Sequence, residues 1–155
     1  MRISTAYRRA VVTKATKQRG PADASTSHPI FEGCTPRARR RLSTLGTRIR
    51  VSAGRPLIKT GGRGAEVLIV LAGTAICEVH DREVARFGPG DFFGEVATLD
   101  GGPRTATVVA GTDMDVLVLN RSEFETLVKS SPEVAHRILT TMAQRLRHAN
   151  AAAVA

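Results

Sequence analysis

The chain has 155 residues, of which 42% are hydrophobic, and it carries a formal net charge of +9. This length is typical of one domain with a hydrophobic core of its own. Five Phe, one Tyr and no Trp argue against recognition of nucleic acid by several stacked aromatic rings. Two cysteines do not form a disulfide framework, and no apolar run reaches the length of a membrane span. We therefore expect a cytoplasmic protein.

The positive charge is concentrated at the beginning of the chain. Six of the 23 basic residues and only one of the 14 acidic residues precede Pro29. We interpret residues 1–28 as a disordered basic tail. Such a tail can also attach to nucleic acid or to an acidic membrane surface, and the sequence leaves this alternative open.

A helix and then a series of strands follow the tail. Thr35 before Pro36 is typical of an N-cap followed by proline at the first helical position, and it predicts a helix to about Leu45. From Thr47 to Leu119 the pattern changes to short segments of period two, separated by glycines. These predicted strands are residues 48–51, 56–59, 66–71, 74–79, 83–87, 105–109 and 114–119. Their spacing predicts a β-sandwich or barrel.

Two helices are predicted at the end of the chain. Asn120 with Glu123 three residues later indicates a capping box, and Ser131 with Pro132 repeats the cap-plus-proline signal. The final helix carries an apolar stripe at helical spacing. The stripe consists of Val134, Ile138, Leu139, Met142, Ala143 and Leu146. It is interpreted as packing on the barrel, covering a ligand or pairing with a partner, and residues 150–155 are expected to be frayed.

The most informative segment is residues 92–108. It contains a glycine turn at Gly94, a carboxylate at Glu95, a short apolar helix, a second glycine turn and then Arg104. A glycine lets the backbone approach a ligand closely, and backbone N–H groups at the start of a helix favour an anion. The guanidinium of an arginine matches a phosphate with two parallel hydrogen bonds. This order of residues favours a pocket for one anionic group and one sugar hydroxyl.

This segment closely resembles the phosphate-binding cassette of the cyclic nucleotide-binding domain family. The resemblance extends from about Pro29 to about His148, and it includes the approach at residues 87–91 and the run at 103–108. It implies a domain over 29–149 that is mainly β with flanking helices. The implied fold is a β-roll of the double-stranded jelly-roll type, with one N-terminal helix and two C-terminal helices.

The resemblance also implies the roles of individual residues. Glu95 would accept a hydrogen bond from the ribose 2′-hydroxyl, Arg104 would pair with the cyclic phosphate, and Thr105 would add a polar contact. Leu99 would be the apolar hinge residue beneath the cassette. The expected ligand-binding residues are Phe93, Gly94, Glu95, Val96, Ala97, Arg104, Thr105 and Ala106. On binding, the cassette would tighten, Leu99 would move, and the two terminal helices would settle against the barrel and the base.

The expected function is a regulatory sensor that binds cyclic AMP without converting it. Cyclic GMP is the alternative, because in eukaryotic members of the family a threonine at position 105 often accompanies cyclic GMP preference. Bacterial cyclic AMP binders of the family also place a hydroxyl residue there. No enzyme, cofactor or metal site is expected, because the four histidines are scattered and no nucleophile motif is present. Nine residues after Leu146 cannot hold a helix-turn-helix module, so we expect no sequence-specific DNA binding. Output would pass to an effector protein, or to self-association, through the final helix.

Two other functions stay open. In the first, the same fold is a ligand-free interaction scaffold in which Glu95 and Arg104 merely pair with each other. In the second, the chain is a small non-specific nucleic-acid binder that depends on residues 1–28.

Overall fold

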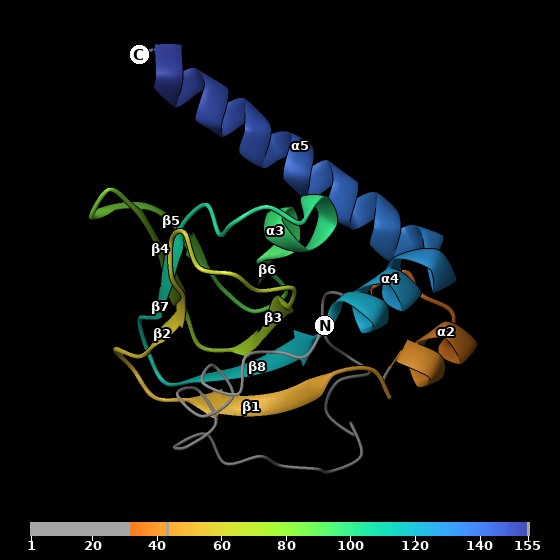
Figure 1. Ribbon diagram of the computed structural model, residues 1–155. Coiled ribbons are helices and arrows are strands. Elements are labelled where there is room, and N and C mark those ends of the chain that lie inside the picture. Colours follow the sequence, from red (N-terminus) through yellow and green to blue (C-terminus); the bar gives the residue numbers. More distant parts are fainter. Residues whose placement is uncertain (1–31, 43, 155) are drawn as a thin grey trace.

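The computed structural model describes residues 32–42 and 44–154, so the predicted tail at 1–28 lies outside the described residues. The described part forms eight strands and four helices (Figure 1). The strands are β1 (Thr47–Val51), β2 (Pro56–Ile58), β3 (Val67–Ala72), β4 (Ala75–Val79), β5 (Arg82–Phe87), β6 (Phe92–Phe93), β7 (Thr107–Ala110) and β8 (Met114–Leu119). The helices are α2 (Pro36–Leu42), α3 (Glu95–Asp100), α4 (Arg121–Ser130) and α5 (Pro132–Val154).

The strands form two antiparallel sheets of four strands each. Their orders are β1-β8-β3-β6 and β2-β7-β4-β5. Neighbours in both sheets are mostly distant in sequence, as expected when a chain folds into a roll and not into simple hairpins. The mainly β class with flanking helices, and a β-roll of the jelly-roll type, are confirmed.

A hydrophobic cluster lies on each face of the β1-β8-β3-β6 sheet. The first lies between the two sheets and includes Leu68 and Val70, whereas the second lies between the β1-β8-β3-β6 sheet and the helices and includes Val67 and Ile69. Strand β3 is therefore buried on both faces. This explains why its sequence is a continuous apolar run without the alternation of a half-exposed strand.

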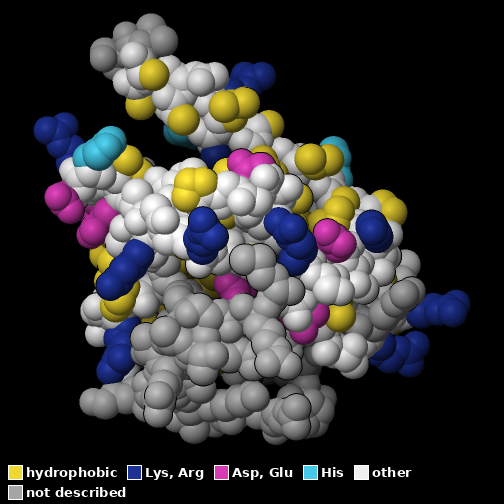
Figure 2. Space-filling model, viewed as in Figure 1, with side chains coloured by type: hydrophobic (Ala, Val, Ile, Leu, Met, Phe, Trp, Pro, Cys, Tyr) yellow, Lys and Arg dark blue, Asp and Glu magenta, His cyan; other side chains and the backbone are white. Residues whose placement is uncertain are grey.

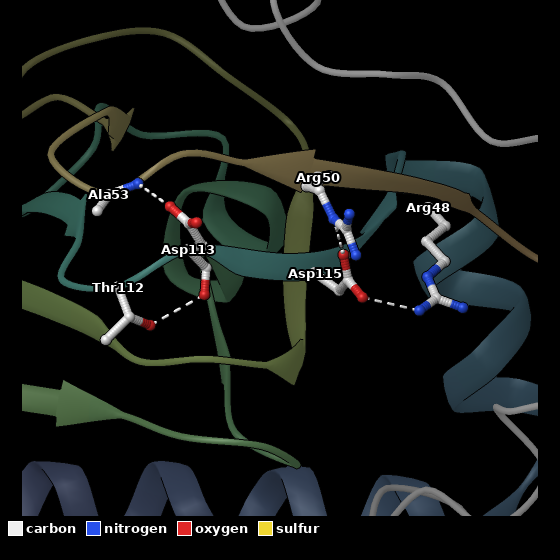
Figure 3. Close-up of polar contacts among 6 residues, drawn as sticks. All are labelled: Arg48, Arg50, Ala53, Thr112, Asp113 and Asp115. Carbon is white, nitrogen blue, oxygen red and sulfur yellow. Dashed lines mark hydrogen bonds and ion pairs between the residues drawn. The ribbon is translucent and has the colours of Figure 1, made fainter.

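Strand β1 lies at the edge of its sheet and shows the expected alternation. Ile49 and Val51 point into the core, whereas Arg48 and Arg50 lie on the outer face beside Asp115 of β8 (Figure 3). Arg48 Nη2 is 2.8 Å from Asp115 Oδ2, and Arg50 Nε is 3.3 Å from Oδ1. Burial raises the pKa of Asp115, but the hydrogen bonds and charges of the two arginines outweigh burial and lower this pKa overall.

The predicted helix starts are confirmed by their caps. The Thr35 hydroxyl accepts a hydrogen bond from the backbone N–H of Ala38. Asn120 and Glu123 form the capping box of α4, and Ser131 Oγ accepts a hydrogen bond from the N–H of Val134 at the start of α5. Each cap satisfies a backbone donor that has no partner inside the helix.

The helix ends differ from the prediction. Helix α2 ends at Leu42, before the predicted end at about Leu45, and α5 continues through residues 150–154, where a frayed end was expected. The residues at 151–153 are alanines, which have the highest helix propensity, and they extend the helix where no cap residue ends it. In Figure 1, α5 passes over α3 and projects beyond the roll.

Candidate functional site

Gly94 forms the turn between β6 and α3, and its surroundings admit only a glycine. The β3–β6 register pairs Leu68 with Phe93, which brings Gly94 against the backbone of Glu66. A Cβ at position 94 would lie 2.7 Å from the carbonyl oxygen of Glu66 and 2.8 Å from Nη1 of Arg104. Gly94 also has a φ of 89°, which residues with a side chain rarely adopt. Backbone conformation and close approach therefore both require glycine here.

Arg104 is buried beside this turn, with only 6% of its surface exposed. Nη1 donates to the Gly94 carbonyl oxygen at 2.9 Å, and Nη2 donates to the Glu66 carbonyl oxygen at 3.0 Å. Nη2 also lies 3.5 Å from Oε2 of the buried Glu66 carboxylate. The backbone of Arg104 exchanges hydrogen bonds with Gly61 and Gly62. The guanidinium is thus held next to the cassette by the 61–66 segment.

Glu95 follows Gly94 directly and is also buried, with 4% of its surface exposed. Its Oε1 lies 2.8 Å from Nη1 of Arg145, which comes from α5. Arg145 Nη2 donates to the Phe92 carbonyl oxygen. The same guanidinium lies over two aromatic rings, with its Cζ 4.9 Å from the Phe87 centroid and 4.7 Å from the Phe92 centroid. Glu95 and Arg104 therefore flank one turn, and each has a buried or half-buried ionic partner.

The other predicted contacts lie around the turn with differing exposure. Phe93 is buried and stacks on Phe87, with ring centroids 5.3 Å apart. Ala97 is buried, Ala106 is partly buried against the core, and Thr105 is exposed. The structure therefore brings the predicted residues to one region, with Thr105 on its outer side.

Helix α3 presents apolar side chains outward. Val96 is 39% exposed and Leu99 is 55% exposed, so Leu99 does not lie beneath the cassette as expected. The residue on the inner side is Thr98, which is buried and whose hydroxyl donates to the Gly94 carbonyl oxygen. Arg121 Nη2 donates to the Thr98 carbonyl oxygen at 2.8 Å and ties α4 to this helix. Helix α3 has six residues, and only one of its sides faces the roll. The glycine turns at its two ends, at Gly94 and Gly101, fix which side this is.

Two charged residues of this region were not predicted. Glu66 was assigned only to the start of a buried strand, and Arg145 only to the surroundings of the apolar stripe. Leu139 and Leu146 of that stripe are 66% and 62% exposed. Arg145 instead follows Ile138 and Met142 on the inner side of α5, at a spacing of four and then three residues. The sequence therefore contained a signal that Arg145 faces inward, because it continues the spacing of the inward-facing residues of α5.

The chemistry of the region is that of binding. Two guanidinium–carboxylate pairs on either side of Gly94 can interact with an anion and with hydroxyl groups. Burial raises the pKa of the nearby Cys77 thiol, and the charge of Arg145 opposes this shift only in part. Cys77 is therefore protonated at neutral pH and is a poor nucleophile.

Within residues 32–42 and 44–154, no three or more His, Cys, Asp and Glu residues are grouped to hold a metal ion. None of the helices in that part of the chain is long and apolar enough to cross a bilayer. A shallow recess of about 630 Å³ lies at the start of α5, lined in part by Glu32 and His136, and it is not part of the cassette.

Comparison with known proteins identifies the family. Residues 48–131 match the model of the cyclic nucleotide-binding domain. The cyclic AMP receptor protein of Thermus thermophilus is 32% identical over 127 residues, which are 79% of this chain and 59% of that protein. The crystal structure of the catabolite activator protein of Thermus thermophilus is 31% identical, with a TM-score of 0.69, over 79% of this chain and 60% of that one.

A further solved structure similar to this chain is PKAR CBD2 with bound Sp-2Cl-cAMPS. It is 26% identical, with a TM-score of 0.68, over 81% of this chain and 86% of that one. The chain spans less than two thirds of the length of the Thermus thermophilus relative. The family match covers more than half of this chain and includes the whole cassette. The chain therefore belongs to the cyclic nucleotide-binding domain family.

Proposed function

We propose that this chain binds a cyclic mononucleotide, with cyclic AMP as the first candidate, and that it does so as a regulatory domain without turnover. The family is a regulatory nucleotide-binding domain. A cyclic AMP receptor protein and a structure with a bound cyclic AMP analogue are among its relatives. These names belong to those proteins, and they make cyclic AMP the ligand to test first in this one.

The observation that carries the proposal is the arrangement at Gly94. A buried guanidinium donates to the Gly94 carbonyl, and a buried carboxylate belongs to the next residue. In the proposed complex, Arg104 pairs with the cyclic phosphate, Glu95 accepts from the ribose 2′-hydroxyl, and backbone amides at Val96 and Ala97 face the sugar and phosphate. One anionic group and one hydroxyl group are thus recognised within the reach of a single nucleotide.

The proposed response to the ligand is a shift between two populations. A ligand shifts such an equilibrium only by its difference in affinity for the two states. Leu99 is 55% exposed in the structure described here, and burying it when the cassette tightens would favour the bound state. The hinge role of Leu99 is therefore part of the proposal.

Output is proposed to pass through α5, either to an effector protein or to a second copy of the chain. Figure 2 shows hydrophobic side chains along this helix, and Leu139 and Leu146 are among its exposed residues. They are seven residues apart and so lie on one side of the helix. Sedimentation of the full chain with and without nucleotide tests self-association, and Leu139→Asp with Leu146→Asp should abolish any that occurs.

Titration calorimetry with cyclic AMP and cyclic GMP tests the binding directly. Thermal unfolding is a second measurement, because a ligand at a hundredfold excess over its Kd stabilises the folded state by about 2.7 kcal/mol. For a domain of this size, that corresponds to a rise in Tm of about 8 °C. No binding heat and no Tm shift with either nucleotide would contradict the proposal.

A second candidate function is a ligand-free interaction scaffold, and one observation favours it. Glu95 and Arg104 already have ionic partners in Arg145 and Glu66, so both charges are compensated without a ligand. The sequence suggested that Glu95 and Arg104 would pair with each other in such a scaffold. In the structure, Glu95 pairs with Arg145 and Arg104 pairs with Glu66 instead. The same two measurements decide between the candidates.

A further inference from the structure

The excess positive charge of the chain lies entirely in residues 1–50. This segment contains 12 of the 23 basic residues and only 2 of the 14 acidic ones, so residues 51–155 carry 11 basic and 12 acidic residues and a net charge of −1. Six of the 12 basic residues fall within residues 32–50, where Glu32 is the only acidic residue. An excess of one sign on a short segment governs which partners that part of the surface attracts.

Helix α2 supplies the first part of a basic surface. Arg37 and Arg40 are both exposed, whereas Ala38 packs against the hydrophobic cluster beneath the helices. Residues three apart in a helix lie on the same side, so the two guanidiniums extend from one side of α2. Figure 2 shows Lys or Arg side chains that project from the side of the molecule where α2 lies in Figure 1.

Strand β1 supplies the second part. Arg48 and Arg50 lie on its outer face, with 43% and 72% of their side chains exposed, and they share the single carboxylate of Asp115 (Figure 3). One carboxylate against two guanidiniums leaves a positive charge. Ion pairs of this exposure contribute little to stability, so a phosphate can replace Asp115 as the partner at little cost. Two residues along a strand span about 6.6 Å, which is close to the separation of successive phosphates on a nucleic-acid strand.

The two parts adjoin each other and lie away from the cassette. Four residues separate the end of α2 from the start of β1, and Figure 1 places the helix beside that end of the strand. Strands β1 and β6 are at opposite edges of their sheet, and the cassette helix α3 follows β6. We call Arg37, Arg40, Arg48 and Arg50 the basic face.

The chemistry of the basic face fits the phosphate backbone of a nucleic acid. A guanidinium matches a phosphate with two parallel hydrogen bonds, and a nucleic acid presents many phosphates in a row. An anionic membrane also presents phosphates, but attachment through a surface helix requires large apolar side chains that enter the bilayer. Among the side chains that the structure describes, the exposed large hydrophobic ones lie on β5, α3 and α5, and none lies on α2 or β1.

We propose that the basic face binds the phosphate backbone of nucleic acid without reading its sequence. Contacts to phosphates position a protein on a nucleic acid and carry no base information. Arg48 and Arg50 exchange Asp115 for phosphates, and Arg37 and Arg40 extend the contact along the backbone. The face binds without the basic residues before Pro29, which add to its affinity. Binding here does not depend on the nucleotide site, because the two surfaces lie at opposite edges of the sheet.

The test measures binding of the full chain to a fluorescently labelled DNA duplex of mixed sequence, by anisotropy, over a series of NaCl concentrations. Each phosphate contact contributes about 0.9 to the slope of log K against log salt concentration, so four contacts weaken binding roughly 150-fold between about 50 and 200 mM NaCl. The pair Arg37→Gln with Arg40→Gln should reduce the size of this slope by about 2, and Arg48→Gln with Arg50→Gln should do the same.

Three further variants of the full chain are controls. Arg82→Gln with Arg86→Gln removes two exposed arginines from β5, in the other sheet, and should leave the slope unchanged. Arg37→Lys with Arg40→Lys keeps both charges and should keep the slope, which separates loss of charge from loss of folding. A chain in which the six basic residues before Pro29 are replaced by glutamine measures the basic face alone and should retain a slope of about −3 to −4.

Smaller slopes in both glutamine pairs of the basic face, with an unchanged β5 control, support the proposal. An unchanged slope in either pair overturns it, as does absence of DNA binding by the wild type. An equal loss in the β5 control would show that only net charge matters, and loss of all binding in the chain without basic residues before Pro29 would assign the binding to that segment. Vesicles that contain phosphatidylserine are a second probe: binding to them without binding to DNA would make the partner a membrane and also overturn the proposal.

Discussion

Replacing Arg104 by alanine tests whether the guanidinium beside Gly94 is structural as well as a candidate ligand contact. The change removes donors to the carbonyl oxygens of Gly94 and Glu66. It also leaves the Glu66 carboxylate, whose side chain is 7% exposed, without this counter-ion. Breaking a buried ion pair from one side costs about 3–5 kcal/mol. We expect the free energy of unfolding of Arg104→Ala to fall by this amount.

Urea denaturation followed by circular dichroism measures this loss. Arg86→Ala is the control, because Arg86 forms its ion pair with Glu83 on the surface, where the two side chains are 63% and 43% exposed. The control should lose far less stability than Arg104→Ala. If Arg104→Ala lowers the free energy of unfolding by less than about 1 kcal/mol, the buried ion pair with Glu66 does not stabilise the fold as expected.

Affinity for the nucleotide is measured on variants of Arg104 that still fold. Leaving a phosphate without its charged partner costs about 2–5 kcal/mol, or roughly 30-fold and more in Kd. Arg104→Lys keeps the charge but loses the planar pair of donors, so it should fold better than Arg104→Ala and still bind more weakly than the wild type. Glu95→Ala should cost less than Arg104→Ala, because its proposed partner is a neutral hydroxyl. Binding by Arg104→Ala equal to that of the wild type would refute the assignment of the phosphate site.

Three further changes have defined outcomes. In Gly64→Ala, the new Cβ would lie 2.6 Å from Nη2 of Arg104; displacement of the guanidinium should cost about 1–3 kcal/mol of stability and weaken nucleotide binding about tenfold. Gly88→Ala, whose Cβ would meet nothing within 4 Å, is its control, and an equal effect there would refute the steric argument. Gly94→Ala places an alanine at a positive φ and brings its Cβ against the Glu66 carbonyl oxygen. Because both effects are unfavourable, Gly94→Ala should lower Tm more than Gly64→Ala does. Against the effect of burial, the two arginines lower the pKa of Asp115 in the folded state, so its ionised carboxylate contributes to stability at neutral pH. This contribution is lost as the pH falls through that pKa. The difference in Tm between the wild type and Asp115→Asn should therefore vanish between about pH 5 and pH 2.

Much of the fold follows from local signals in the sequence. The caps at Thr35, Asn120 and Ser131 act through hydrogen bonds to backbone groups three residues away, so they can be recognised without knowledge of the tertiary structure. The alternation in β1 likewise predicts which side chains face the core. The position of the cassette helix follows from the glycines at both of its ends, where a left-handed backbone is required.

The ionic partners in the candidate site depend on the tertiary structure alone. Glu66 and Arg104 are 38 residues apart, and Glu95 and Arg145 are 50 residues apart. They meet because the β3–β6 register sets Glu66 against Gly94, and because the packing of Val134 and Ile138 directs α5 over α3. Charge pairing has no fixed spacing along a chain, in contrast to a cap or a strand. The sequence by itself therefore predicted which residues would bind a nucleotide, and the packing of α5 decided that Arg145 contacts one of them, Glu95.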